Sequence, residues 1–163
     1  MEFFVLLVVY QLKHFLADYP LQNSYMLKKF LGGRDWILPL ATHAGVHAVF
    51  TFVISAVYLQ DLTMLSVALA AVDFVCHFVM DRVKASPKLM GRWKTVSADE
   101  YRSLARMASY DGTNGELQCG RQMAERKLKS NTYFWWALGI DQMIHHLTHY
   151  AIIFFLILGK NWG

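Results

Sequence analysis

The sequence predicts an all-α protein, a four-helix transmembrane bundle that forms a single membrane domain over residues 1–163. Apolar residues make up 55% of the chain and are concentrated in four long stretches. The 16 Lys and Arg residues are nearly absent from these stretches and crowd into the connectors between them. Basic connectors between apolar segments are typical of membrane topology, so this distribution accounts for the net charge of +4. We therefore expect a membrane protein and no nucleic-acid partner.

One helix is expected for each apolar stretch. Pro20 ends the first helix, because the residue before a proline is disfavoured in helical geometry, and Asp35 is the expected N-cap of the second. The second and third helices are separated only by Gln60 and Asp61, and helices joined by so short a turn pack antiparallel. The aromatic run 133–136 begins the fourth helix, as aromatic residues do at a membrane interface. The predicted helices span residues of about 3–19, 36–59, 62–83 and 133–158.

A polar, mostly basic insert, residues 84–132, separates the third helix from the fourth. Ser97 and Glu100 have the spacing of a capping box, and the apolar residues that follow them recur on one helical face. This pattern predicts a partly helical insert with an amphipathic helix lying against the membrane or the bundle. An insert that only solvates the connection is equally consistent with its composition.

The positions of Lys and Arg predict the orientation of the chain. With four spans, both basic connectors lie on one side of the membrane, and the positive-inside rule makes that side cytoplasmic. Both termini then face outward. The first stretch begins Met1-Glu2-Phe3 without a basic segment, so we expect a retained helix instead of a cleaved signal peptide. Membrane lipids are the expected partners, because the basic insert would lie against the anionic inner leaflet.

Each apolar stretch carries two ligand-type side chains four residues apart, a spacing that places both on one helical face. From the rise per residue, most of them lie about 8 to 18 Å from the cytoplasmic end, with Asp18 and Asp81 nearer that end. Ionisable side chains at membrane depth are costly and are functional by default. The pairs are His14 and Asp18, His43 and His47, His77 and Asp81, and Asp141 and His145.

These four pairs are sufficient for one or two divalent metal ions. Imidazole and carboxylate ligands favour zinc, with manganese and iron as alternatives. Asp73, one turn from His77, and Asp18 are the candidate catalytic bases. Gln22, Gln142 and Lys84 are expected to orient the ligands, and Lys84 is also placed to attract an anionic head group. A structural hydrogen-bond network and an ion or proton pathway are the alternatives to a metal.

Two further polar residues are expected to lie outside this layer. Lys13 is adjacent to His14 and must face elsewhere, which predicts either snorkelling to the interface or pairing with a carboxylate. His149 would lie about 24 Å deep, below the ligand layer, as a packed or outer-side polar residue.

The motifs His-x-x-x-Asp, His-x-x-x-His and Asp-Gln-x-x-His resemble those of a family of small polytopic membrane proteins from bacteria and phages, catalogued as a domain of unknown function. The chain is more distantly similar to predicted membrane-bound metal-dependent hydrolases. A weaker likeness links its histidine pairs to the histidine boxes of membrane desaturases and hydroxylases. The resemblance implies an inner-membrane location in bacteria or in phage-infected hosts.

The expected function is therefore an integral membrane metal-dependent hydrolase that acts on a lipid or lipid-linked ester or phosphoester near the cytoplasmic leaflet. A di-iron oxidative enzyme is the alternative among enzymes. A divalent-metal or proton transporter and a non-catalytic membrane adaptor are the alternatives from other classes. The outer halves of the first two stretches, 3–10 and 50–59, are almost wholly apolar, which argues against a polar path through the membrane.

Overall fold

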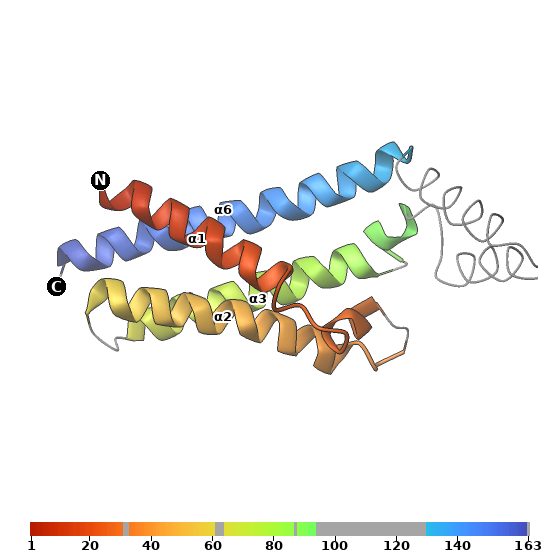
Figure 1. The fold of residues 1–163 in the computed structure, drawn as a ribbon, viewed down its shortest axis with the longest axis horizontal. Coiled ribbons are helices and arrows are strands. Elements are labelled where there is room, and N and C mark those ends of the chain that lie inside the picture. Colours follow the sequence, from red (N-terminus) through yellow and green to blue (C-terminus); the bar gives the residue numbers. More distant parts are fainter. Residues whose placement is uncertain (31–32, 61–63, 87, 94–129, 163) are drawn as a thin grey trace, which may run out of the picture. The chain divides into compact units, whose positions relative to one another are not determined.

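The computed structural model of the 163-residue chain describes residues 1–30, 33–60, 64–86, 88–93 and 130–162. Its helices are α1 (Glu2–Asp18), η1 (Met26–Phe30), α2 (Ile37–Leu59), α3 (Met64–Ala85), η2 (Met90–Trp93) and α6 (Thr132–Trp162) (Figure 1). The elements labelled η are short 3₁₀ helices, and the other four are α-helices. No strand occurs in the described ranges, so the predicted all-α class is confirmed for them.

The chain divides into two compact units, one made of Met1–Ala85 with Asp141–Gly163 and the other of Ser86–Ile140. The first unit contains α1, α2, α3 and the C-terminal part of α6, and with them every predicted site residue. In the second unit, the backbone amides of Leu89 and Gly91 donate to the Ser86 carbonyl, beside η2. The amphipathic helix predicted after Ser97 lies outside the described residues.

The start of α2 differs from its prediction. The N-cap is Trp36 and no side chain caps the helix, so the expectation that Asp35 caps it is wrong. The Trp36 side chain makes two contacts at this turn. Its Nε1 donates to the Gly33 carbonyl, and the Arg82 guanidinium lies 3.8 Å from the centre of its ring. A cation stacked on an indole face is a favourable contact of this kind.

The other ends of α1 and α2 are as predicted. Helix α1 ends at Asp18, two residues before Pro20. Helix α2 ends at Leu59, and its C-cap, Gln60, adopts the left-handed conformation with φ of 56°. A single left-handed residue is a common way to end a helix, and here it reverses the chain toward α3.

Neighbouring helices of the first unit run antiparallel. On the hairpin of α2 and α3, Thr51 contacts Asp73 and, two turns away on each helix, His43 contacts Asp81. The chain's two ends also meet, because Lys160 Nζ donates to Glu2 Oε1 over 3.0 Å (Figure 1). The four helices therefore alternate in direction, which brings the C-terminal end of α1 and the N-terminal end of α2 to the same end of the unit.

The half of this unit that holds the chain termini has an apolar core. Its buried members come from α1, α3 and α6, and side chains at the end of α2, including Ile54 and Leu59, pack against them. The buried members are Leu6, Tyr10, Leu69, Ile152, Ile153 and Leu156.

The other half is polar inside and apolar outside. Among the described residues, more polar and charged side chains are buried than apolar ones, while large apolar side chains such as Val49 and Val75 are exposed. Soluble proteins show the opposite distribution. Helices α2, α3 and α6 are long and apolar enough to cross a membrane, whereas α1, with 17 residues, is shorter. The distribution and the lengths together support the membrane class predicted from the sequence.

Candidate metal centre

The buried polar side chains lie in successive layers, one helical turn apart, between the apolar core and the other end of the bundle. This arrangement follows from spacing, because positions four apart on a helix share one face. The inward positions on α2 are His43, His47, Thr51 and Ser55, and those on α3 are Asp81, His77 and Asp73.

Asp18, the last residue of α1, lies at the centre of the first group. Its Oδ1 is 3.1 Å from His47 Nε2 and 3.3 Å from His43 Nε2, and its Oδ2 is 3.1 Å from His14 Nε2. The ligand atoms of Asp18, His43 and His47 all lie within 4.8 Å of one another. Ligands bound to one zinc ion at about 2.1 Å lie about 3.4 Å apart, so small side-chain movements would allow this group to bind one ion.

A second group combines α3 with α6. The ligand atoms of Asp81, Asp141 and His145 also lie within 4.8 Å of one another, and all three side chains are buried. Asp81 Oδ2 is in addition 3.2 Å from His43 Nε2, which belongs to the first group. The two groups are thus in contact through His43 and Asp81, as the two halves of a two-metal site would be.

A lysine pairs with each carboxylate of the second group. Lys29 Nζ, from η1, donates to Asp81 Oδ2 over 2.7 Å, and Lys84 Nζ, from α3, donates to Asp141 Oδ2 over 2.6 Å. Lys84, which was expected to help orient ligands, thus contacts a candidate ligand, and its orienting role stays a prediction. Lys29 was not predicted, because a residue in a short 3₁₀ connector follows no apolar periodicity.

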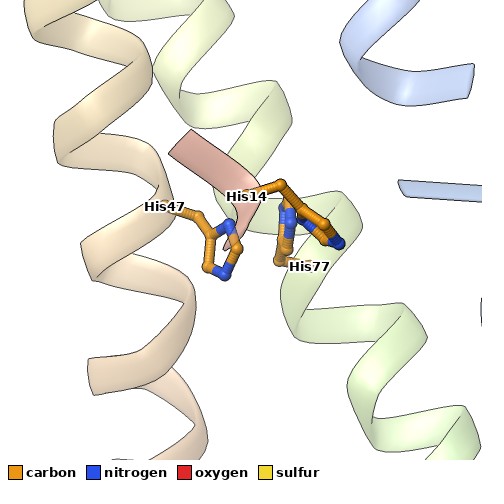
Figure 2. A group of neighbouring side chains, drawn as sticks. All are labelled: His14, His47 and His77. Carbon is orange, nitrogen blue, oxygen red and sulfur yellow. The ribbon is translucent and has the colours of Figure 1, made fainter. Parts of the chain in front are cut away.

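His77 lies in the middle of the cluster. Its ring stacks on His47, with 3.8 Å between ring centroids, and on His145, with 4.2 Å and only 7° between the planes. Figure 2 shows His14, His47 and His77 converging from α1, α2 and α3, and their ligand atoms form a third group within 4.8 Å. His77 Nδ1 is 2.9 Å from the Asp73 carbonyl oxygen, which leaves Nε2 for a different partner.

The two predicted glutamines have different positions. Gln142 Nε2 donates to Asp141 Oδ2 over 3.2 Å, and Gln142 Oε1 lies 3.1 Å from His14 Nε2. It therefore connects Asp141 of the second group with His14, which contacts Asp18 of the first group; the orienting role stays a prediction. Gln22 is half-buried in the connector after α1, outside these groups.

Asp73 lies one turn deeper and has its own partners. Lys13 Nζ donates to Asp73 Oδ2 over 2.6 Å, and Thr51 Oγ1 donates to the same oxygen over 2.8 Å. Lys13 thus pairs with a carboxylate, which is one of the two alternatives predicted for it. The prediction that Asp73 acts as a general base is not tested by these contacts.

His149 was expected to lie outside the ligand layer, and instead it belongs to the cluster. Its Nε2 is 3.0 Å from Lys13 Nζ and 3.6 Å from Asp73 Oδ1, and its side chain is buried. The sequence did contain a signal for this position, because His149 follows His145 at the same spacing of four that identified the other pairs.

Several buried polar atoms in this cluster lack a hydrogen-bond partner among the described residues. Both ring nitrogens of His145 and Oδ1 of Asp141 are in this state. A buried donor or acceptor without a partner costs about 1–3 kcal/mol. A metal ion bound by Asp81, Asp141 and His145 would satisfy Asp141 Oδ1 and one of the two ring nitrogens of His145, and the mixture of imidazole and carboxylate fits zinc, manganese or iron.

The fold and these side chains define a class of protein: a bundle with helices long enough to cross a membrane and an interior rich in His and Asp. The chain belongs to the family described as "Protein of unknown function (DUF3307)", which matches residues 4–162. The predicted likeness to a family of unknown function is thereby confirmed. No curated protein and no solved structure matches the chain.

Proposed function

We propose that the protein is an integral membrane metal-dependent hydrolase that acts on a lipid or lipid-linked ester or phosphoester. One observation carries the proposal, namely that two groups of candidate metal ligands are in contact. The first group has one carboxylate and two imidazoles, from α1 and α2, and the second has two carboxylates and one imidazole, from α3 and α6. They meet where His43 Nε2 lies 3.2 Å from Asp81 Oδ2. Buried His and Asp side chains from several helices are costly at membrane depth and are kept mainly where they have a function.

We assign one ion to each group. Asp18, His43 and His47 would hold the first ion with His14 beside them, and Asp81, Asp141 and His145 would hold the second. His77, stacked between His47 and His145, is a candidate ligand for either ion. Zinc is favoured by the number of imidazoles, with manganese and iron as alternatives.

A pair of divalent ions would supply a polarised substrate oxygen and a bound water of lowered pKa. The chain itself must position the substrate and accept a proton. Three histidines contact the Asp18 side chain, yet it is 18% exposed, whereas the Asp73 side chain is fully buried against Lys13 and Thr51. Asp18 is therefore better placed as the general base, through the carboxylate oxygen that the first ion would leave free, and Asp73 is better placed to fix the neighbouring side chains.

The position of the groups along the helices suits an amphiphilic substrate. Asp18 ends α1 and Asp81 lies in the last two turns of α3, so both carboxylates are at the end of the unit where the basic connectors begin. By the positive-inside rule this is the cytoplasmic end. Hydrolysis needs water, and a site near the interface has access both to water and to the lipid head-group region.

The apolar half of the bundle weighs against a transporter. Leu6, Leu69 and Leu156, with their neighbours in the core, fill the interior between the polar layers and the end where the chain termini meet. An ion leaving the His and Asp cluster in that direction would have to cross an apolar region, which carries a large desolvation cost.

The test is metal-dependent release of product by purified protein in detergent. Three substrates separate the reaction classes: phosphatidic acid for phosphomonoesters, phosphatidylglycerol for phosphodiesters, and a long-chain acyl nitrophenyl ester for carboxylic esters. Release that requires added zinc, manganese or iron, and that is lost in His145→Ala but kept in His146→Ala, supports the proposal. Equal release by wild type and His145→Ala from all three substrates, with every metal, overturns it.

A further inference from the structure

Of the two lysines of η1, one is buried and the other is exposed. Lys29 is buried against Asp81, at the candidate metal centre. Lys28 is exposed, and its Nζ lies 5.9 Å from the centre of the Tyr25 ring. The outward lysine is therefore free of the metal centre and belongs to a separate feature of the surface.

That feature is a pocket of about 440 Å³ at the N-terminal end of α2. It presents two cations, Lys28 and Arg34, against the single carboxylate of Asp35, so its charge is net positive. Its remaining lining is aromatic or aliphatic, which suits the junction between a head group and an acyl chain. The residues that line it are Tyr25, Lys28, Arg34, Asp35, Leu38 and Pro39.

An apolar groove of about 420 Å³ lies farther along the same helix. It begins at Thr42, four residues after Leu38, and its members recur every three or four positions, so pocket and groove share one face of α2. From Thr42 to Val53 the groove extends about 16 Å, close to the thickness of one leaflet of hydrocarbon, about 15 Å. The residues that line it are Thr42, Gly45, Val46, Val49, Phe50 and Val53.

Gly45 lies in the floor of this groove. A Cβ atom built there would have no neighbouring atom within 4 Å, so packing within the chain does not require a glycine at this position. Glycine inside a helix is destabilising relative to alanine by roughly 0.5–1 kcal/mol. A partner that lies closely against α2 from outside would account for it.

We propose that this pocket and groove bind one anionic phospholipid, with its phosphate between Lys28 and Arg34 and an acyl chain along the groove. Charge complementarity at the pocket and the one-leaflet length of the groove favour a lipid over a second copy of the chain. The proposal needs neither a metal ion nor catalysis, so it stands or falls independently of the proposed hydrolase activity.

Native mass spectrometry of detergent-purified protein, titrated with phosphatidylglycerol or phosphatidylcholine, measures the binding. Wild type should bind one phosphatidylglycerol more tightly than phosphatidylcholine. The double variant Lys28→Gln with Arg34→Gln should lose about 30-fold in affinity for phosphatidylglycerol, and it should no longer discriminate between the two lipids. Gly45→Leu, which fills the groove, should weaken the binding of both lipids.

Two matched controls are available. Lys88→Gln removes an exposed basic residue outside the pocket, and Gly139→Leu fills open space at another helical glycine; both should bind lipid as wild type does. Equal affinity for the two lipids in wild type, or unchanged affinity in both pocket and groove variants, overturns the proposal. Displacement of the lipid by glycerol 3-phosphate at equal concentration would identify a free-phosphate site instead. A fall in dimer fraction in Gly45→Leu, without a change in lipid affinity, would identify a second copy.

Discussion

Lys13 Nζ lies 2.6 Å from Asp73 Oδ2, and the two side chains are 1% and 0% exposed. The pair joins α1 to α3 between the His and Asp cluster and the apolar core. Thr51 and His149, from α2 and α6, contact the same two side chains, so all four helices meet at this ion pair. A charge buried this deeply is stable only while its partner is present.

Replacing Lys13 with methionine should therefore destabilise the bundle strongly. Removing one member of a buried ion pair costs about 3–5 kcal/mol, because the remaining charge is left unpaired, whereas replacing both members with apolar residues is often neutral. We expect Lys13→Met to lower the free energy of unfolding in detergent by about this amount, and the double variant Lys13→Met with Asp73→Leu to recover most of the loss.

The exposed pair of Lys160 and Glu2 provides the control. Its lysine side chain is 43% exposed, so Lys160→Met should leave the unfolding transition nearly unchanged. A Lys13→Met protein that unfolds together with wild type would show that the buried pair contributes no stability.

The metal content of single variants should show which residues bind each ion. Elemental analysis of protein purified without chelators should find up to two ions per chain. His145→Ala should lose the ion of the second group only, while His43→Ala should affect both ions, because His43 contacts both Asp18 and Asp81. His146→Ala is the matched control, since His146 follows His145 directly but is half-buried, belongs to neither group, and contacts Gln11 and the ring of His14. Wild-type protein without bound metal would contradict the assignment.

Bound metal should also stabilise the fold. An ion at a free concentration 100 times its Kd adds about 2.7 kcal/mol to the stability of the folded state. We expect a chelator to remove this increment from wild type and to have a smaller effect on Asp141→Asn, which has lost a charged ligand of the second group but keeps the first group. Asp35→Asn, a substitution at an exposed residue outside both groups, should respond to the chelator as wild type does. Thermal unfolding with and without chelator measures the difference.

Much of the architecture could be predicted from the sequence because it depends on local rules. Apolar length predicted the helices, and Pro20 predicted the end of α1. Spacing of four on each helix identified the side chains that meet, and the tight reversal at Gln60 aligned those of α2 with those of α3. The two ligand groups consist wholly of residues selected in this way.

The remainder depends on tertiary contacts that periodicity does not encode. The N-cap is Trp36, whose ring contacts Arg82, a residue of a different helix. Depth counted along separate helices placed His149 below the ligands, yet the packing of α6 against α1 brings it to Lys13. The position of Lys29 depends on how η1 packs against α3, which no repeat in the sequence specifies.

Lys29 leads to the last prediction, which concerns the strength of metal binding. Its ammonium group donates to Asp81 Oδ2 over 2.7 Å, so it neutralises a carboxylate that we assign to a metal ion. In Lys29→Met the buried carboxylate of the metal-free protein has lost its ammonium partner and keeps its contact with His43, and the metal-bound protein is relieved of a nearby positive charge. Both effects favour binding, so the Kd for zinc should fall by at least about tenfold, which corresponds to about 1.4 kcal/mol.

Competition with a chromophoric chelator measures this Kd. Lys28→Met is the matched control, because Lys28 is the neighbouring residue of η1 but is exposed, and its variant should bind zinc as wild type does. Weaker zinc binding in Lys29→Met would reverse the interpretation: the lysine would then hold Asp81 in its ligand position instead of competing with the ion for it. The sign of the change in Kd therefore distinguishes a competing cation from a positioning residue.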